Sequence, residues 1–265
     1  MVWTIQSDDN VRDAGQWRNA ENYAYVKQLP PAGCAWEFLR RNPDYKKAWL
    51  VFKADPNASS KENSGAAGFG LLRFESPERD ARTANVFWRP GVSREVLRLI
   101  ASRRDSGNCC PTLPLDELQC RMTLQSGRAG EQHILFAEDG RFLQLEIQGL
   151  NALDAACLST EIVLSPPRLL AAQVQGLRRL ADIVSRRCLR ACFYPPDKRA
   201  SRFTRLLQVL DGWNARASYR EMALAIFGDA RVSADWRNPH LRDHLRRALR
   251  SGTALMLNGY GRLLK

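Results

Sequence analysis

The spacing of apolar residues changes twice along this chain, and this change restricts the fold more than any other feature of the sequence. Between residues 119 and 164 the segments QCRMTL, QHILFA, RFLQLEIQ and TEIVLS alternate or run apolar at strand length. Glu138-Asp139-Gly140 predicts a hairpin turn between the second and third segments. On both sides of this stretch the spacing is helical. The sequence therefore predicts an α+β protein with an N-terminal helical head, a small central antiparallel sheet with helices, and a C-terminal group of helices.

The helical head is predicted to occupy residues 1–54. Asn42-Pro43 divides it into two helices, because the residue before a proline disfavours helical geometry. Each helix has an apolar face at helical spacing, formed by Ala35, Trp36 and Leu39 in the first and by Tyr45, Trp49 and Phe52 in the second. Aromatic residues at this spacing usually form core, so we assign them to packing rather than to ligand binding.

Residues 55–68 read DPNASSKENSGAAG, which is a polar, Gly/Ser-rich composition typical of a linker or mobile loop. A central α+β domain is predicted from 69 to 195. Besides the strands, it contains a predicted helix through Val96, Leu97 and Ile100. A second helix follows Pro167 and is closed by Pro195-Pro196. Its apolar stripe consists of Leu170, Val174, Leu177, Leu180 and Val184.

The positive charge of the chain is concentrated at one end. The 265 residues carry a formal net charge of +12. Residues 1–177 hold 21 basic and 21 acidic residues, whereas residues 178–265 hold 19 basic and 7 acidic residues, which accounts for the whole excess. All but two of those 19 cations are arginine, whose planar guanidinium group binds phosphate or guanine through two hydrogen bonds. This composition indicates a polyanionic partner, and nucleic acid fits it better than a small acidic metabolite.

Residues 196–265 are predicted to form the DNA-binding domain, which contains three helices. The first covers about 201–213. The second starts at Ser218-Tyr219-Arg220-Glu221, a capping box, and ends at Gly228. The third starts at Asn238-Pro239 and ends at Gly252. Asn258-Gly259 then predicts a short ribbon. The arrangement resembles a helix-turn-helix, although an irregular stretch of about ten residues separates the last two helices instead of the usual three or four.

Exposed polar positions of this domain are the candidate DNA contacts. Four of them, His240, Arg246, Arg247 and Arg250, lie on the polar part of the third helix and are the candidates for base contacts. The other candidates are Arg202, Arg205, Ser218, Arg220, Arg237, Asn238, Arg242 and Arg262. The competing interpretation is that these side chains are only solvated charges, or that they pair with acidic groups elsewhere in the chain.

Several segments together resemble RovC-type regulators, which activate type VI secretion genes in Gram-negative bacteria. They are AWEFLRRNPDYKKAW (residues 35–49), FWRP (87–90), SYREMALAIFG, HLRDHLRRALRSG and NGYGRLL. The resemblance covers nearly the whole chain. It implies a sequence-specific activator that binds double-stranded promoter DNA through its C-terminal domain and acts as a higher homo-oligomer, with a hexamer as the candidate size. RNA polymerase or another regulator is a further candidate partner.

Catalytic signatures are missing from the sequence, so we expect neither an enzyme nor a cofactor. GxGxxG, GxxxxGK[ST] and GxSxG motifs do not occur. His240 and His244 have the spacing of a zinc-binding pair, but HLRDH lacks the glutamate of HExxH and places Arg242 beside the histidines. Cys188 and Cys192, near arginines, fit either an inert pair or a redox sensor, and the inert pair is the more usual case.

Two other functions fit the same composition. The first is a protein-binding antagonist of another regulator that makes no DNA contact. The second is a nuclease, although nuclease chemistry generally needs clustered carboxylates holding a divalent metal, and the tail has only scattered ones. No apolar run approaches the roughly 18 residues of a membrane span. The N-terminus also lacks a signal peptide pattern, so we expect a cytoplasmic protein without a membrane partner.

Overall fold

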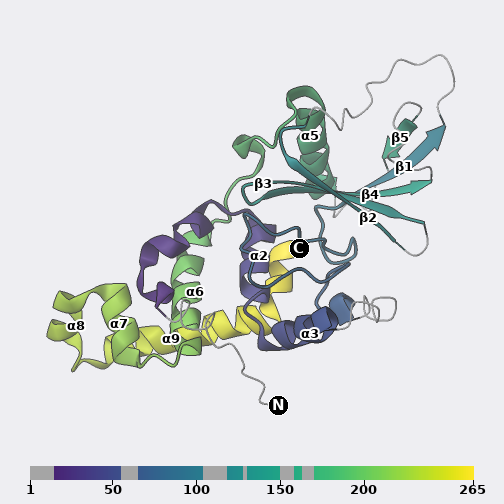
Figure 1. Ribbon diagram of the computed structural model, residues 1–265. Coiled ribbons are helices and arrows are strands. Elements are labelled where there is room, and N and C mark those ends of the chain that lie inside the picture. The colour runs from purple at the N-terminus through teal and green to yellow at the C-terminus, as the bar shows by residue number, and fades with distance from the viewer. Residues whose placement is uncertain (1–14, 55–64, 104–117, 128–129, 150–157, 163–169) are drawn as a thin grey trace. The chain divides into compact units, whose positions relative to one another are not determined.

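The computed structural model describes residues 15–54, 65–103, 118–127, 130–149, 158–162 and 170–265. The chain divides into two compact units. The helical unit comprises residues 15–29 and 196–260 of the described chain, and the sheet unit comprises the described residues of 30–195 together with 261–265 (Figure 1). None of the described helices is long and apolar enough to cross a membrane.

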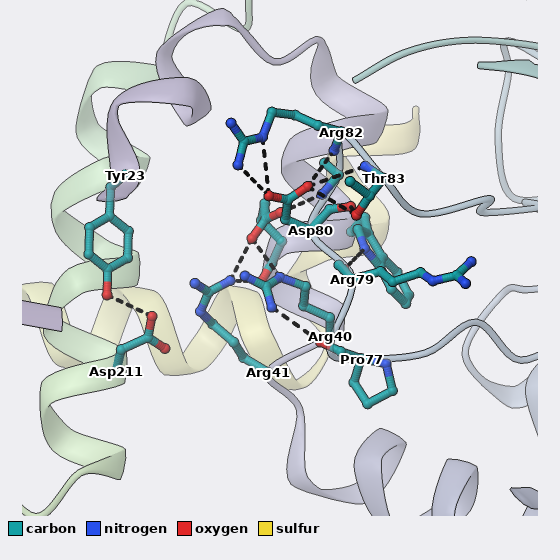
Figure 2. A network of polar contacts seen from close by, with 12 residues as sticks. Tyr23, Arg40, Arg41, Pro77, Arg79, Asp80, Arg82, Thr83 and Asp211 are labelled. Carbon is teal, nitrogen blue, oxygen red and sulfur yellow. Dashed lines mark hydrogen bonds and ion pairs between the residues drawn. The ribbon is translucent and has the colours of Figure 1, made fainter. Parts of the chain in front are cut away.

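The helical unit is organised around α6 (Ala200–Asn214), which packs against both η2 (Ala20–Gln28) and α9 (Pro239–Leu257). The short η1 (Gln16–Arg18), α7 (Tyr219–Phe227) and α8 (Asp229–Asp235) complete the unit. The side of α6 that carries Phe203, Leu206 and Leu210 is buried, as its spacing predicts. The Tyr23 hydroxyl on η2 donates a 2.8 Å hydrogen bond to Asp211 on α6 (Figure 2). The segment before residue 30 thus packs with the C-terminal helices.

The sheet unit contains five strands in the order β2-β3-β4-β1-β5. Their bounds are β1 Leu97–Arg103, β2 Arg121–Ser126, β3 Gln132–Glu138, β4 Arg141–Gly149 and β5 Leu158–Ile162. The predicted hairpin is confirmed, since Glu138 pairs with Arg141 and Asp139 and Gly140 have φ of 47° and 78°. Two positive φ values are typical of a two-residue type I′ turn. The α+β class is confirmed.

Strand β1 corrects two predictions. The helix expected through Val96, Leu97 and Ile100 is wrong, because residues from Leu97 onward form β1, and the sheet is mixed because β1 runs parallel to β4. Leu97, Leu99 and Ala101 are buried while Arg98 and Ile100 are exposed, which is a period of two. Apolar residues at positions 96, 97, 99 and 100 suit a helix as well as a strand. The pairing of β1 with β4, far along the chain, selects the strand.

One face of the sheet is covered by α5 (Leu170–Arg186) (Figure 1). The approach is close at Gly176, where a Cβ atom would lie 2.8 Å from the Leu97 side chain. The predicted apolar stripe is only partly buried, since the side chains of Leu170 and Val174 are 44% and 39% exposed. The helix also ends at Arg186, before the predicted stop at Pro195-Pro196, and Arg187 then adopts a φ of 64°. A short η7 (Ala191–Phe193) follows.

Two helices of the predicted head belong to the sheet unit, namely α2 (Pro31–Leu39) and α3 (Pro43–Ala54). Their division at Asn42-Pro43 is confirmed. Trp36 and Tyr45 are fully buried and meet edge to face, with ring centroids 5.7 Å apart, as expected for core aromatics. Residues 55–64 of the predicted linker lie outside the described residues, and residues 65–68 form a helical turn. The division of the chain into four domains stays a prediction.

A buried ion cluster lies at the end of α2. Arg40 Nε and Arg41 Nη1 each donate a 2.7 Å bond to Oε2 of Glu37, and the backbone N–H of Ala81 donates a 2.8 Å bond to Oε1. Arg40 and Arg41 lie side by side in Figure 2. Burial by itself would raise the pKa of Glu37, but the charges and hydrogen bonds of Arg40 and Arg41 outweigh it and lower the pKa to about 2. The carboxylate is therefore ionised inside the protein.

The end of the chain differs from the prediction. Helix α9 continues through Gly252 to Leu257, and residues Gly259–Leu264 form the 3-10 helix η8 in place of the predicted ribbon. Gly252 is a packing residue rather than a helix stop, since a Cβ there would approach Leu210 of α6 to 3.0 Å. The last five residues belong to the sheet unit, where the Leu264 carbonyl accepts a 3.1 Å bond from the Arg94 backbone N–H.

Candidate DNA-binding surface

A helix-turn-helix lies within the helical unit. The stretch predicted to be irregular after Gly228 contains α8, and only residues 236–238 separate α8 from α9. This connection has the three-residue length that a helix-turn-helix normally uses. Helix α8 is missing from the sequence prediction because it spans only seven residues and buries one apolar side chain, Val232, which is too little for a helical period. Figure 1 shows α7 and α8 beside the N-terminal half of α9.

Local capping signals position these helices. The predicted capping box at the start of α7 is confirmed, since the Ser218 hydroxyl accepts from the Glu221 N–H and the Glu221 carboxylate accepts from the Ser218 N–H. The Asn238 side chain caps α9 by accepting a 3.3 Å bond from the His240 N–H, as predicted. The side chains of both capping residues are therefore engaged in holding the helix ends.

Gly228 sets the angle between α7 and α8. Its φ of 83° and ψ of 158° lie in a region that is essentially restricted to glycine. We expect Gly228→Ala to lower the free energy of unfolding by about 1–3 kcal/mol through backbone strain alone, because a Cβ at this position meets no atom within 4 Å. Urea denaturation followed by circular dichroism measures this loss. Gly15→Ala is the matched control, since Gly15 has a φ of −110° and equally open surroundings. Equal losses in the two variants would refute the strain argument.

Helix α9 presents a basic face. Its packed side consists of Leu241, Leu245, Ala248, Gly252 and Met256. The exposed positions recur at helical spacing on the other side, at His240, Asp243, Arg246, Arg247 and Arg250. One carboxylate therefore stands among three arginines on this face.

Two arginines of this face, Arg246 and Arg247, are held in place but not neutralised. Arg246 forms an exposed 3.1 Å ion pair with Asp243, in which the two side chains are 58% and 51% exposed. Arg247 Nε donates a 3.3 Å bond to the Asp243 carbonyl, and the Arg246 guanidinium stands 5.9 Å from the centre of the Tyr219 ring. Exposed ion pairs of this kind are worth little and exchange readily with other anions.

Three arginines from three helices converge around His244. Burial lowers the pKa of His244, and the nearby charges of Arg205 on α6, Arg247 on α9 and Arg231 on α8 lower it further. The ring of His244 stands edge-on to Phe227, with centroids 5.5 Å apart. The histidine is therefore neutral near pH 7, and the three guanidinium groups around it form a concentrated positive field.

The structure brings together eleven of the twelve predicted contact residues. Arg202 and Arg205 lie on α6, Ser218 and Arg220 at the start of α7, Arg237 and Asn238 in the turn, and the remaining five on α9. Arg262 is the exception, because it belongs to the sheet unit. The pair Arg246–Asp243 is the one ion pair that these residues form within the described chain. All of them except the half-buried Arg242 are exposed, so acidic groups of that part of the chain do not bury them.

Arg231 is a candidate that sequence reasoning missed. It is exposed on α8, and its guanidinium lies 5.4 Å from the centre of the Phe227 ring. It was missed because its segment was expected to be irregular. With Arg231, the described helical unit holds 14 basic and 7 acidic residues. The excess of positive charge thus persists within this unit taken alone.

Two other kinds of chemistry were considered from the sequence, namely metal binding and redox sensing by cysteine. Within the described ranges, no three His, Cys, Asp or Glu side chains gather as a metal site. Cys188 is half-buried, Cys192 is exposed, and both are free thiols. The two cysteines are therefore not a buried pair, and a redox role for them stays untested.

Comparisons with known families agree with this geometry. Residues 162–265 match the model RovC_DNA-bd, described as the DNA-binding domain of a transcription factor of the type VI secretion system, T6SS. Residues 16–70 match the model of a proteobacterial transcriptional regulator-like domain. Together the two matches span more than half of the chain. No curated protein matches it.

Proposed function

The chain belongs to the RovC-type transcription factors, and from this premise we propose that it activates secretion-system genes by binding promoter DNA through the arginine face of its helical unit. The observation that carries this proposal is the arrangement of exposed guanidinium groups on α6, α8 and α9 around a three-residue turn. A helix that follows such a turn is the one that enters the major groove in helix-turn-helix proteins. The proposed activity is binding without catalysis, in the cytoplasm where the promoter is accessible.

Base recognition is assigned to the N-terminal half of α9. Recognition helices contact base edges through their first turns, and His240, Arg246 and Arg247 are the exposed residues there that carry hydrogen-bond donors. An arginine can pair with the O6 and N7 atoms of guanine through two hydrogen bonds. Arg246 would exchange its exposed pair with Asp243 for such a contact.

Phosphate binding is assigned to the cations around α9. Arg202 and Arg205 on α6, Arg220 on α7 and Arg237 in the turn are all exposed. Contacts of this kind fix the position of a protein on the duplex without reading its sequence. Arg231 joins this group because it shares the surroundings of His244 with Arg205.

Replacing His240 and Arg220 separately distinguishes base recognition from phosphate binding. We expect His240→Ala to relax the preference at one base pair by about tenfold or more, because a lost base contact removes discrimination. Arg220→Gln should instead weaken binding to all sequences alike. It should also lower the magnitude of the slope of log K against log salt concentration by about one. Competition gel shifts with single-base operator variants measure both effects. A uniform loss in both variants would contradict the assignment of His240 to bases.

Assembly of several copies is part of the proposal. A single helix-turn-helix buries little DNA surface, and linked copies on repeated half-sites multiply affinity. We therefore propose a homo-oligomer, with a hexamer as the candidate size, that contacts RNA polymerase or another regulator to activate transcription. Light scattering of the full chain with and without operator DNA determines the number of copies.

Footprinting on genomic fragments upstream of secretion-system genes tests the function. A regulator protects discrete sites that recur between experiments. A protein-binding antagonist leaves every fragment unprotected, and a nuclease cuts the fragment when magnesium is added. Either of the last two results would overturn the proposal.

A further inference from the structure

A row of polar side chains crosses the sheet on the face opposite α5. The strand register places His133 of β3 beside Glu146 of β4, and Glu146 beside Arg98 of β1. Their neighbours Ile134, Leu145 and Leu97 point to the other face and join the core under α5, as the alternation of a strand requires. The row lies between residues 70 and 162, a stretch that neither family match covers.

The polar row forms the floor of a hollow within the sheet unit. This hollow has a volume of about 960 Å³, and its rim includes Arg89, Val92 and Glu131. Its size is at the upper end of the range typical of sites for small molecules. Four charged side chains and a histidine in one hollow indicate a polar ligand rather than an apolar one.

The hydrogen bonds of this row leave two buried atoms without a partner among the described residues, namely Nδ1 of His133 and Oε1 of Gln125, which the register of β2 and β3 places beside His133. Glu146 Oε2 accepts a 2.8 Å bond from Arg98 Nε, and Glu146 Oε1 accepts a 3.4 Å bond from Gln148 Nε2. His133 is only 2% exposed, yet its Nδ1 atom has no hydrogen-bond partner in the described part of the chain. A buried polar atom in this state costs free energy. A ligand hydroxyl reaching Nδ1 would remove that cost.

The unused hydrogen-bond donors of the hollow favour an anion, whereas the charges of its two arginines and two glutamates balance. Both oxygens of Glu146 are already occupied, and Glu131 takes part in interactions of its own. Arg98 uses only Nε within the described chain, and its side chain is 46% exposed, so its two terminal nitrogens are available as donors. Arg89 is exposed at the rim. Burial lowers the pKa of His133 against the opposing effects of Glu146 and Glu131, which leaves the ring neutral and able to bond a hydroxyl.

We propose that this hollow binds a small hydroxylated anion, either a hydroxy acid or a phosphate ester. The anionic group contacts the guanidinium groups of Arg98 and Arg89, and a hydroxyl beside it hydrogen-bonds to His133 Nδ1. The shared chemistry of the two ligand types is an anion with a neighbouring hydroxyl. A divalent metal is a poorer fit, because no cluster of three metal-ligating side chains occurs among the described residues.

Calorimetric titration of the full chain tests the site, with citrate and glycerol phosphate as probes. Glycerol and inorganic phosphate are the references, since the first lacks the anion and the second lacks the neighbouring hydroxyl. We expect at least one probe to bind about tenfold or more tightly than its references, as two charge-assisted hydrogen bonds would give. If neither probe binds more tightly than the references, the proposal is wrong.

Three variants locate the binding. His133→Phe keeps the ring volume and removes the unpartnered atom, so the melting temperature should not fall while the affinity for the probe drops about tenfold. Arg89→Gln, at an exposed position, should also weaken binding of the probe. This variant provides the test if His133→Phe does not fold. Arg178→Gln, exposed on α5, is the control and should bind as the wild type does. Unchanged affinity in Arg89→Gln would overturn the proposal. No DNA is present in this assay, so its outcome is independent of the proposed promoter binding.

Discussion

Replacing Arg246, Arg247 and Arg250 together with glutamine is expected to weaken promoter binding by a hundredfold to a thousandfold at physiological salt. Hydrogen bonds from a charged group contribute about 1.5–3 kcal/mol each, so three lost contacts reach roughly this size even if they are not fully additive. All three side chains are exposed on the face of α9 opposite its packed side. Their removal should therefore leave the fold intact, which circular dichroism verifies. Fluorescence anisotropy with a labelled promoter fragment measures the affinity.

The matched control removes the same amount of charge from the sheet unit. Lys47, Lys53 and Arg94 are exposed there, and their replacement by glutamine should change affinity by less than about threefold, since it removes none of the proposed DNA contacts and salt screens the remaining effect of net charge. A similar loss in the two triple variants would mean that binding follows net charge alone. The proposal that α9 makes specific contacts with DNA would then be wrong.

The second large effect is expected from Glu37→Gln, which should lower the free energy of unfolding by about 3–5 kcal/mol. Glu37 is fully buried, and Arg40 and Arg41 beside it are 17% and 7% exposed. Glutamine keeps the shape and the acceptor for the Ala81 N–H, but its –NH2 group replaces the oxygen that accepts from Arg40 and Arg41, so the change removes the charge together with those two hydrogen bonds. Removing the charge of Glu37 takes away the carboxylate that both arginines contact in the interior, and this costs more than the ion pair itself contributes. Urea denaturation at neutral pH measures the loss.

The same residue predicts a dependence on pH. The folded pKa of Glu37 is about 2, against an ordinary value of 4.5, so its contribution to the free energy of unfolding is fully present above about pH 4.5 and is lost as pH falls towards 2. The stability difference between the wild type and Glu37→Gln should therefore shrink over this window. Glu78→Gln, at an exposed position, should show little change at any pH. If the difference in the free energy of unfolding between the wild type and Glu37→Gln stayed constant down to about pH 2, Glu37 would not be ionised in the folded protein.

Elements with a local signal were predictable from the sequence. The capping box at Ser218, the cap at Asn238 and the hairpin at Asp139 and Gly140 each depend on residues within a few positions of one another. Their side chains and backbone angles determine the structure without distant contacts. The charge excess at the C-terminus was likewise readable, because a count of residues needs no fold.

Elements that depend on distant contacts were not predictable in this way. Strand β1 exists because it pairs with β4, more than forty positions along the chain. Gly252 continues a helix because it faces Leu210, although a glycine in that position usually indicates a helix end. The chain also carries Arg262 into the sheet unit, so its neighbours in sequence were a poor guide to its neighbours in space.

The hollow above the sheet had no sequence signal at all. His133, Glu146 and Arg98 come from three strands and meet only through the register of β3, β4 and β1. In the sequence, His133 is one histidine within a strand pattern. Only the hydrogen bonds of the folded sheet show that its Nδ1 atom has no partner among the described residues.

The salt dependence of promoter binding by the full chain tests the central claim most directly. If the arginines of the helical unit neutralise four or more phosphates, the logarithm of the association constant must fall linearly with the logarithm of salt concentration, with a slope of roughly minus four or steeper. Replacing Arg202, Arg205 and Arg220, which are assigned to phosphates, with glutamine should lower the magnitude of that slope by about three. A wild-type slope near zero, or the same slope in the wild type and this variant, would contradict the claim that the arginines of the helical unit bind the DNA backbone.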